Sequence, residues 1–189
     1  MNTKFLGKTL VASALVLTTI GTGLYSSYLG LDTNKVVKTA KAEENMTNGQ
    51  LWKKVKDSLI DSKIISGNEN ETVKVTFTTT SGQSNSVEST ANHDTVTNTP
   101  SNFSKLSQID ITKVNITDFN TRIDANETWK TLTQKLKGQG LVTDGDTVTI
   151  HSSDKTDPEI KGKVGSEMND HKGLILMLNK RDINKITIE

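Results

Sequence analysis

The segment LWKKVKDSLIDSKIIS, residues 51–66, decides the fold because it is repeated as TWKTLTQKLKGQGLVT, residues 128–143. The two segments align at an offset of 77 residues, which places the two tryptophans of the chain, Trp52 and Trp129, on each other. In both copies apolar residues stand three and seven positions after the tryptophan, the spacing of one face of a helix. The sequence therefore predicts two copies of one amphipathic helix.

The residues around these segments predict where each helix begins and ends. Thr47 with Gln50, and Asp124 with Glu127, have the spacing of N-terminal caps, in which side chains satisfy the amides of the first turn. Glycine takes up a positive φ at little cost and commonly ends a helix. The predicted end residues are Gly67 in the first copy and Gly138 or Gly140 in the second.

Period-two alternation of apolar residues after each helix predicts half-buried strands. The alternating residues are Val73, Val75 and Phe77 in the first copy and Val148 and Ile150 in the second. Each copy then ends in a similar phrase, DITKVNI at residues 110–116 and DINKITI at 182–188, aligned at an offset of 72. The phrases predict closing strands that contain Val114 and Ile116, and Ile186 and Ile188, with Ile111 and Ile183 entering by a turn or bulge. Residues 173–178, GLILML, predict a further buried strand.

The predicted fold class is α+β, with two tandem repeats of a helix and an antiparallel sheet. Residues 43–120 form the first repeat and residues 121–189 the second, either as separate domains or on one shared sheet. Ser, Thr and Asn make up 17 of the 27 residues at 78–104, which predicts a long exposed hairpin or flexible loop, as does the polar segment 152–172. Such loops at the end of a rigid sheet are candidates for a contact surface.

Residues 1–42 have the features of a secretory signal. Lys4 and Lys8 precede the apolar run LVASALVLTTI, and Ala40 and Ala42 provide a small-x-small cleavage pattern before Glu43. The apolar run is shorter than the roughly 20 residues of a spanning helix, so a retained anchor is the secondary interpretation. We expect a protein released by a bacterium with a single membrane, with loose attachment to the cell wall as the alternative.

Charge and cysteine content exclude several classes of function. Cleavage before Glu43 leaves 147 residues with 18 basic and 21 acidic side chains. This balance, without a basic stripe, predicts no binding to nucleic acid. We also expect no membrane association after cleavage. The chain has no cysteine, so packing alone must stabilise the exported domain.

Catalytic and metal-binding motifs are scarce, and we predict no catalytic, cofactor-binding or metal site. The serines lack a nucleophile-elbow motif. His93, His151 and His171 stand in or beside polar segments without metal-ligand spacing, so each is predicted to be solvated. Asp144-Gly145-Asp146 lacks the later ligands of a calcium loop and predicts a tight turn.

The helix segments at 52–66 and 129–142, followed by the closing phrases, resemble staphylococcal secreted β-grasp proteins. The similar families are the extracellular adherence protein repeats and the C-terminal domain of the superantigen-like proteins. This resemblance implies a host-directed protein that binds or blocks a protease, complement component or receptor, and it carries over no functional residue. The duplicated architecture also resembles secreted bacterial protein inhibitors built from two tandem copies.

We therefore expect a secreted, non-enzymatic binding protein, a host-interaction or immune-evasion factor with a host or competitor protein as partner. The alternative is an envelope-associated protein that binds wall polymer or assists a wall enzyme. A small hydrolase built from scattered carboxylates is a third hypothesis.

Overall fold

The computed structural model describes residues 46–94, 97–115, 121–156, 159–166 and 176–189. It confirms the α+β class: two helices accompany a six-stranded antiparallel sheet and a small two-stranded sheet. The predicted signal, residues 1–42, lies outside the described residues. In the part of the chain that is described, no helix has the length and apolarity needed to cross a membrane.

The two predicted helices are α1, Asn48–Asp61, and α2, Ala125–Gly138. Both predicted N-caps are confirmed. The Thr47 hydroxyl accepts a hydrogen bond from the Gln50 amide at 3.2 Å, with the Gln50 side chain accepting from the Thr47 amide in return. The Asp124 carboxylate accepts from the Glu127 amide at 2.8 Å.

The helices end in the same way in both copies. Lys63, at φ 63°, follows α1, and Gly140, at φ 73°, follows α2. The next amides donate back to the last turn, from Ile64 to the Leu59 carbonyl and from Leu141 to the Leu136 carbonyl. The prediction that Gly140 ends the second helix is confirmed, whereas the prediction that Gly67 ends the first is wrong. A lysine adopts the left-handed conformation at the end of α1, and Gly67 lies in the following loop.

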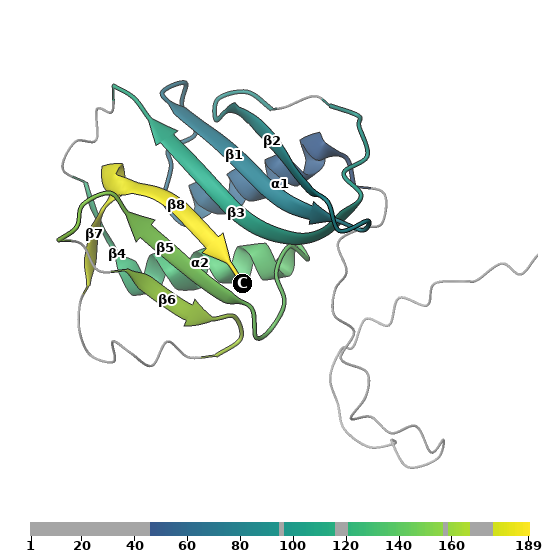
Figure 1. Cartoon of the computed structure of the whole chain (residues 1–189). Coiled ribbons are helices and arrows are strands. Elements are labelled where there is room, and N and C mark those ends of the chain that lie inside the picture. The colour runs from purple at the N-terminus through teal and green to yellow at the C-terminus, as the bar shows by residue number, and fades with distance from the viewer. Residues whose placement is uncertain (1–45, 95–96, 116–120, 157–158, 167–175) are drawn as a thin grey trace, which may run out of the picture. The chain divides into compact units, whose positions relative to one another are not determined.

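Six strands form one sheet in the order β2-β1-β3-β8-β5-β6 (Figure 1). The first copy supplies β1 (Glu71–Thr79), β2 (Ser84–Thr90) and β3 (Phe103–Lys113). The second copy supplies β5 (Thr147–Ser152), β6 (Ile160–Lys163) and β8 (Ile183–Ile188). The closing strands β3 and β8 pair antiparallel at the centre, so the two copies share one sheet. The polar segments 78–104 and 152–172 contain the edge strands β2 and β6.

Both tryptophans are buried and fasten a helix to a strand. The indole Nε1 of Trp52 donates to the Val73 carbonyl at 2.8 Å, and that of Trp129 donates to the Val148 carbonyl at 2.9 Å. A buried indole needs such an acceptor, because an unpaired polar atom in the core costs free energy. The repeated helix stripe is therefore a core feature, as expected from its apolar spacing.

The duplication extends beyond the segments that sequence similarity reveals. The small sheet consists of β4, Arg122–Asp124, and β7, Met177–Asn179. In it Asp124 pairs with Met177, and the first copy has the equivalent pair in the bridge between Thr47 and Pro100. The counterparts differ by 77 residues, as the tryptophans do. The predicted strand at 173–178 is found in part, since β7 begins at Met177 and residues 173–175 lie outside the described residues.

The two closing phrases are not equivalent segments of the fold. In the sheet, Val73 faces Ile111 and Val148 faces Ile188, so the true offset of the closing strands is 77 and not 72. Ile111 lies inside β3, whereas Ile183 follows the 3-10 turn η2, Lys180–Asp182. Val114 lies beyond the end of β3 with 54% of its surface exposed, contrary to the prediction, and Ile116 is outside the described residues. An odd slip of five residues moves a strand's side chains to the opposite face.

Candidate functional site

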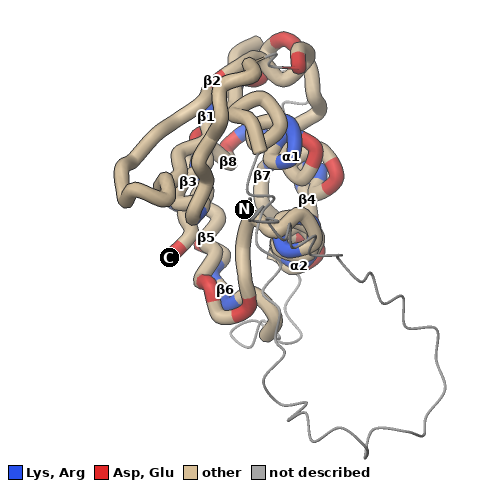
Figure 2. Tube along the Cα trace, turned by 90° about the vertical axis from the view of Figure 1, so that its right-hand side faces the viewer, with Lys and Arg blue, Asp and Glu red and all other residues tan. Residues whose placement is uncertain are grey.

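The sheet has one covered face and one open face. Both helices lie on the same side of the sheet, and their apolar stripes pack against the inward residues of the strands (Figures 1 and 2). The alternate residues of the strands point to the opposite side, over which no helix of the described chain lies. We call this second surface the open face.

A row of charged side chains crosses the open face, with one residue on each of five strands and the last directly before β6. Cross-strand register places Lys74 opposite both Glu88 and Asp110, Asp110 opposite Lys185, and Lys185 opposite His151. The row ends at Glu159, whose Oε2 lies 3.2 Å from His151 Nδ1. From β2 to β6 the order is Glu88, Lys74, Asp110, Lys185, His151, Glu159. The first four side chains of this charged row alternate in sign, and the row spans roughly 24 Å at about 4.8 Å per strand.

A second row, beside the first, consists mainly of hydroxyl and amide groups. Register gives it the order Ser86, Thr76, Gln108, Thr187, Thr149, Lys161. The internal duplication relates the two rows, because Asp110 is the counterpart of Thr187, and Lys185 that of Gln108. The copies have therefore diverged on the open face, where one row has acquired charges and the other hydroxyls.

The ammonium groups of the charged row are available to a partner. Lys74 and Lys185 are exposed, and within the described residues neither forms an ion pair or a side-chain hydrogen bond. The Asp110 carboxylate is held in place by Gln108, whose Nε2 lies 2.7 Å from Oδ1. The row thus presents unpaired cations beside an oriented carboxylate.

His151 joins the two rows. Its Nε2 lies 3.0 Å from the Thr187 hydroxyl, while its Nδ1 faces Glu159. This order of groups is that of a hydroxyl, imidazole and carboxylate triad. Acyl transfer also needs amide donors for an oxyanion, but Thr187 lies in a strand that is paired on both sides. The contacts instead orient the imidazole on the open face. His151, predicted to be solvated in or beside a polar segment, lies near the end of β5 beside such a segment, with its side chain half-buried. His93 is exposed after β2, and His171 is outside the described residues.

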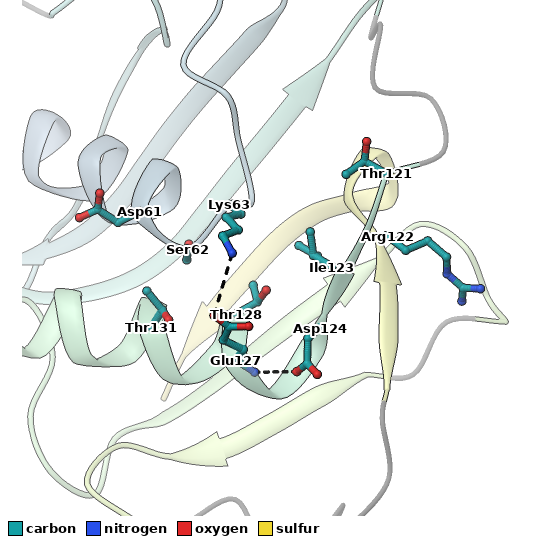
Figure 3. A pocket seen from close by; sticks show the side chains of 10 residues that line it. All are labelled: Asp61, Ser62, Lys63, Thr121, Arg122, Ile123, Asp124, Glu127, Thr128 and Thr131. Atoms are coloured by element: carbon teal, nitrogen blue, oxygen red, sulfur yellow. Dashed lines mark hydrogen bonds and ion pairs between the residues drawn. The ribbon is translucent and has the colours of Figure 1, made fainter.

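A pocket of about 290 Å³ lies between the end of α1, β4 and the first turns of α2 (Figure 3). Its lining includes Ser62 and Lys63 after α1, Ile123 from β4, and Thr128 from α2. Glu127 lies across from Lys63, with Nζ and Oε1 4.0 Å apart. This pocket could not be predicted from the sequence, because it forms where the two copies meet.

Glu71 and Lys180 are buried beside the loop that follows α1, and Lys113 beside them is half-buried. The Glu71 carboxylate accepts hydrogen bonds from the amides of Ser66, Gly67 and Asn68, at 2.7 to 3.1 Å. Lys113 Nζ donates to the Ile64 carbonyl at 2.9 Å and to the Lys180 carbonyl. Burial lowers the pKa of Lys113 to about 8, an effect that the Glu71 carboxylate partly offsets. This cluster connects the first copy to the segment before β8, and its inward position gives it a structural role.

The predicted turn at residues 144–146 is confirmed. Gly145 has a φ of 93°, and the Asp146 carboxylate accepts a hydrogen bond from the Thr143 amide at 2.8 Å. Asp146 thereby repeats the role of Glu71 in the first copy. No cluster of His, Asp and Glu in the described residues has the arrangement of a metal site.

These features define a class of protein: a duplicated two-layer α+β domain with helices on one face of the sheet and polar rows on the other. The chain belongs to the family described as "Domain of unknown function (DUF4888)", whose model matches residues 47–188. A comparison with curated proteins found no match.

Proposed function

We propose that this protein is a secreted, non-enzymatic binding module that docks a host or competitor protein on its open face. The observation that carries the proposal is the charged row, in which Lys74 and Lys185 lack partners within the described chain. Groups of this kind, held at fixed spacing on a rigid sheet, provide orientation and specificity to a protein interface. The resemblance to staphylococcal secreted β-grasp proteins supports an immune-evasion role.

The alternation of charge favours a protein partner over a uniformly anionic polymer. The charged row has three carboxylates, Glu88, Asp110 and Glu159, and two lysines. A polyanion laid along it would meet repulsion at alternate strands, whereas a protein surface can present both signs. Neither row has a Trp, Tyr or Phe side chain on which sugar rings could stack.

One observation favours the alternative, an envelope-associated protein that binds wall polymer. Lys161 and Lys163 of β6 are exposed beside the hydroxyls of the second row, and Lys185 lies on the same half of the sheet. This half of the open face would attract an anionic polymer.

Affinity capture tests the proposal. The mature chain, residues 43–189, is immobilised and exposed to host serum, to neutrophil extract and to purified peptidoglycan. The matched variants are Lys74→Glu with Lys185→Glu on the open face, and Lys54→Glu with Lys130→Glu on the helix layer, each changing the charge by the same amount. We expect a protein to bind the wild type and the helix-layer variant but not the open-face variant. Recovery of wall material alone, or equal capture by both variants, would contradict the proposal.

A further inference from the structure

Several residues that line the pocket between α1 and α2 differ in chemistry from their counterparts in the other copy. Thr128, on its lining, stands where the first copy has Leu51, which is fully buried. Glu127 is the counterpart of Gln50, and Lys63 that of Gly140. At each of these positions one copy has an apolar, neutral or absent side chain and the other has a hydroxyl, a carboxylate or an ammonium group. The hydroxyl and the carboxylate belong to the second copy and the ammonium group to the first.

The hydroxyl of Thr128 is a second observation that points to a ligand. Thr128 has 4% of its surface exposed and lines the pocket. Within the described residues its hydroxyl has no hydrogen-bond partner, so it can bond to a molecule in the pocket. A leucine, which the fold accepts at the equivalent place, would leave no such group. The second copy thus has a hydroxyl on the pocket wall at a position where the first copy has an apolar side chain.

The charged side chains around the pocket differ in whether another group of the protein already holds them firmly. Asp61 forms an ion pair with Lys135 at 2.7 Å, and Asp124 caps α2. Lys63 and Glu127, by contrast, face each other at 4.0 Å with side chains that are both 70% exposed (Figure 3). A contact of this length and exposure is weak. Arg122, also on the lining, donates to the Met177 carbonyl, so Lys63 and Glu127 are the charged pair that a ligand can bridge.

We propose that this pocket binds a free α-amino acid with a small side chain. Its ammonium group pairs with Glu127, and its carboxylate pairs with Lys63 and accepts a hydrogen bond from Thr128. Ile123, which is nearly buried, provides an apolar wall for the side chain. The pocket, of about 290 Å³, has room for a ligand of this size. The site is separate from the open face, so it is independent of the proposed protein partner.

The ligand's charges can be tested one at a time. The mature chain is titrated with L-alanine, with N-acetyl-L-alanine, which lacks the ammonium group, and with L-alanine amide, which lacks the carboxylate. Amide chemical shifts are followed by heteronuclear NMR. We expect L-alanine to shift the amides of Lys63, Glu127 and Thr128, and each blocked compound to bind about tenfold more weakly or worse, since a hydrogen bond to a charged group is lost.

The other copy supplies the matched variants. Glu127→Gln, Lys63→Gly and Thr128→Leu each install the residue of the equivalent position, and each is expected to weaken L-alanine binding about tenfold or more. Lys130→Gln, on α2 outside the pocket, is expected to bind like the wild type. Glu127 is exposed, so its variant remains informative if Thr128→Leu fails to fold. No shift with L-alanine, equal binding of N-acetyl-L-alanine, or unchanged binding by Glu127→Gln would overturn the proposal.

Discussion

Ile109 and Ile186 face each other at the centre of the sheet, and each is the counterpart of the other in the duplicated unit. Their separation of 77 residues equals that of Trp52 and Trp129. The pseudo-twofold axis that relates the copies therefore passes through this pair. Because the closing strand of each copy pairs with its own counterpart, neither copy leaves that edge exposed to pairing with another chain.

The symmetry predicts similar contributions from the two tryptophans. Trp52→Phe and Trp129→Phe each remove an indole N–H, which leaves the Val73 or Val148 carbonyl without its donor. We expect each variant to lower the free energy of unfolding by about 2 kcal/mol, from the lost hydrogen bond and the smaller ring. Urea unfolding followed by circular dichroism measures both values. A loss confined to one variant would show that the copies are not energetically equivalent.

Gly162 and its counterpart Ser89 should respond differently to alanine. A Cβ on Gly162 would lie 2.7 Å from Cζ2 of Trp129, a distance that forces the indole to move. We expect Gly162→Ala to cost about 1–3 kcal/mol in unfolding free energy, as overpacking does. Ser89, opposite Val73, already has a Cβ, so Ser89→Ala serves as the control and should change stability by less than about 0.5 kcal/mol. Equal values for the two variants would contradict this account of the Trp129 packing.

The loop after each helix is held by a carboxylate, but with unequal strength. Glu71 accepts from three successive amides, whereas Asp146 accepts only from the amide and hydroxyl of Thr143 among the described hydrogen bonds. We expect Glu71→Gln to lower the free energy of unfolding by about 2–3 kcal/mol and Asp146→Asn by about 1 kcal/mol. Thermal and urea unfolding of both variants give the comparison. The reverse order would refute the assignment.

Lys113 predicts a gain in stability at high pH. Its pKa is about 8 in the folded protein and 10.5 in the unfolded chain. Between these values the unfolded chain binds more protons than the folded one, so the free energy of unfolding rises with pH, by at most about 3 kcal/mol. Below pH 8 both states are protonated and the gain is absent.

Comparison with a variant isolates the Lys113 contribution from other lysines. Urea unfolding at pH 7.5 and pH 10.5 should show a rise in the wild type that is larger than in Lys113→Met. Lys74→Met, at an exposed lysine, should retain the wild-type rise. The same pH dependence in the wild type and in Lys113→Met would contradict the predicted depression of the pKa.

The sequence alone determined the helices and the existence of the duplication. Trp52 and Trp129 with their apolar stripes, and the caps Thr47 and Asp124, are local signals whose spacing specifies a helix without reference to the rest of the chain. The alternation after each helix likewise indicated β1 and β5. The end of α1 was not predicted correctly because Lys63, rather than a glycine, adopts the left-handed conformation there.

Tertiary structure alone decided how the copies meet. Strand register is set by pairing across the sheet, so the similarity of residues 110–116 and 182–188 could not show that the true counterparts are Ile109 and Ile186. The charged row and the pocket have the same origin: each brings together residues far apart in sequence. Periodicity shows whether a residue faces toward or away from the core. Only the order of the strands and the packing of α1 beside α2 determine which residues become its neighbours.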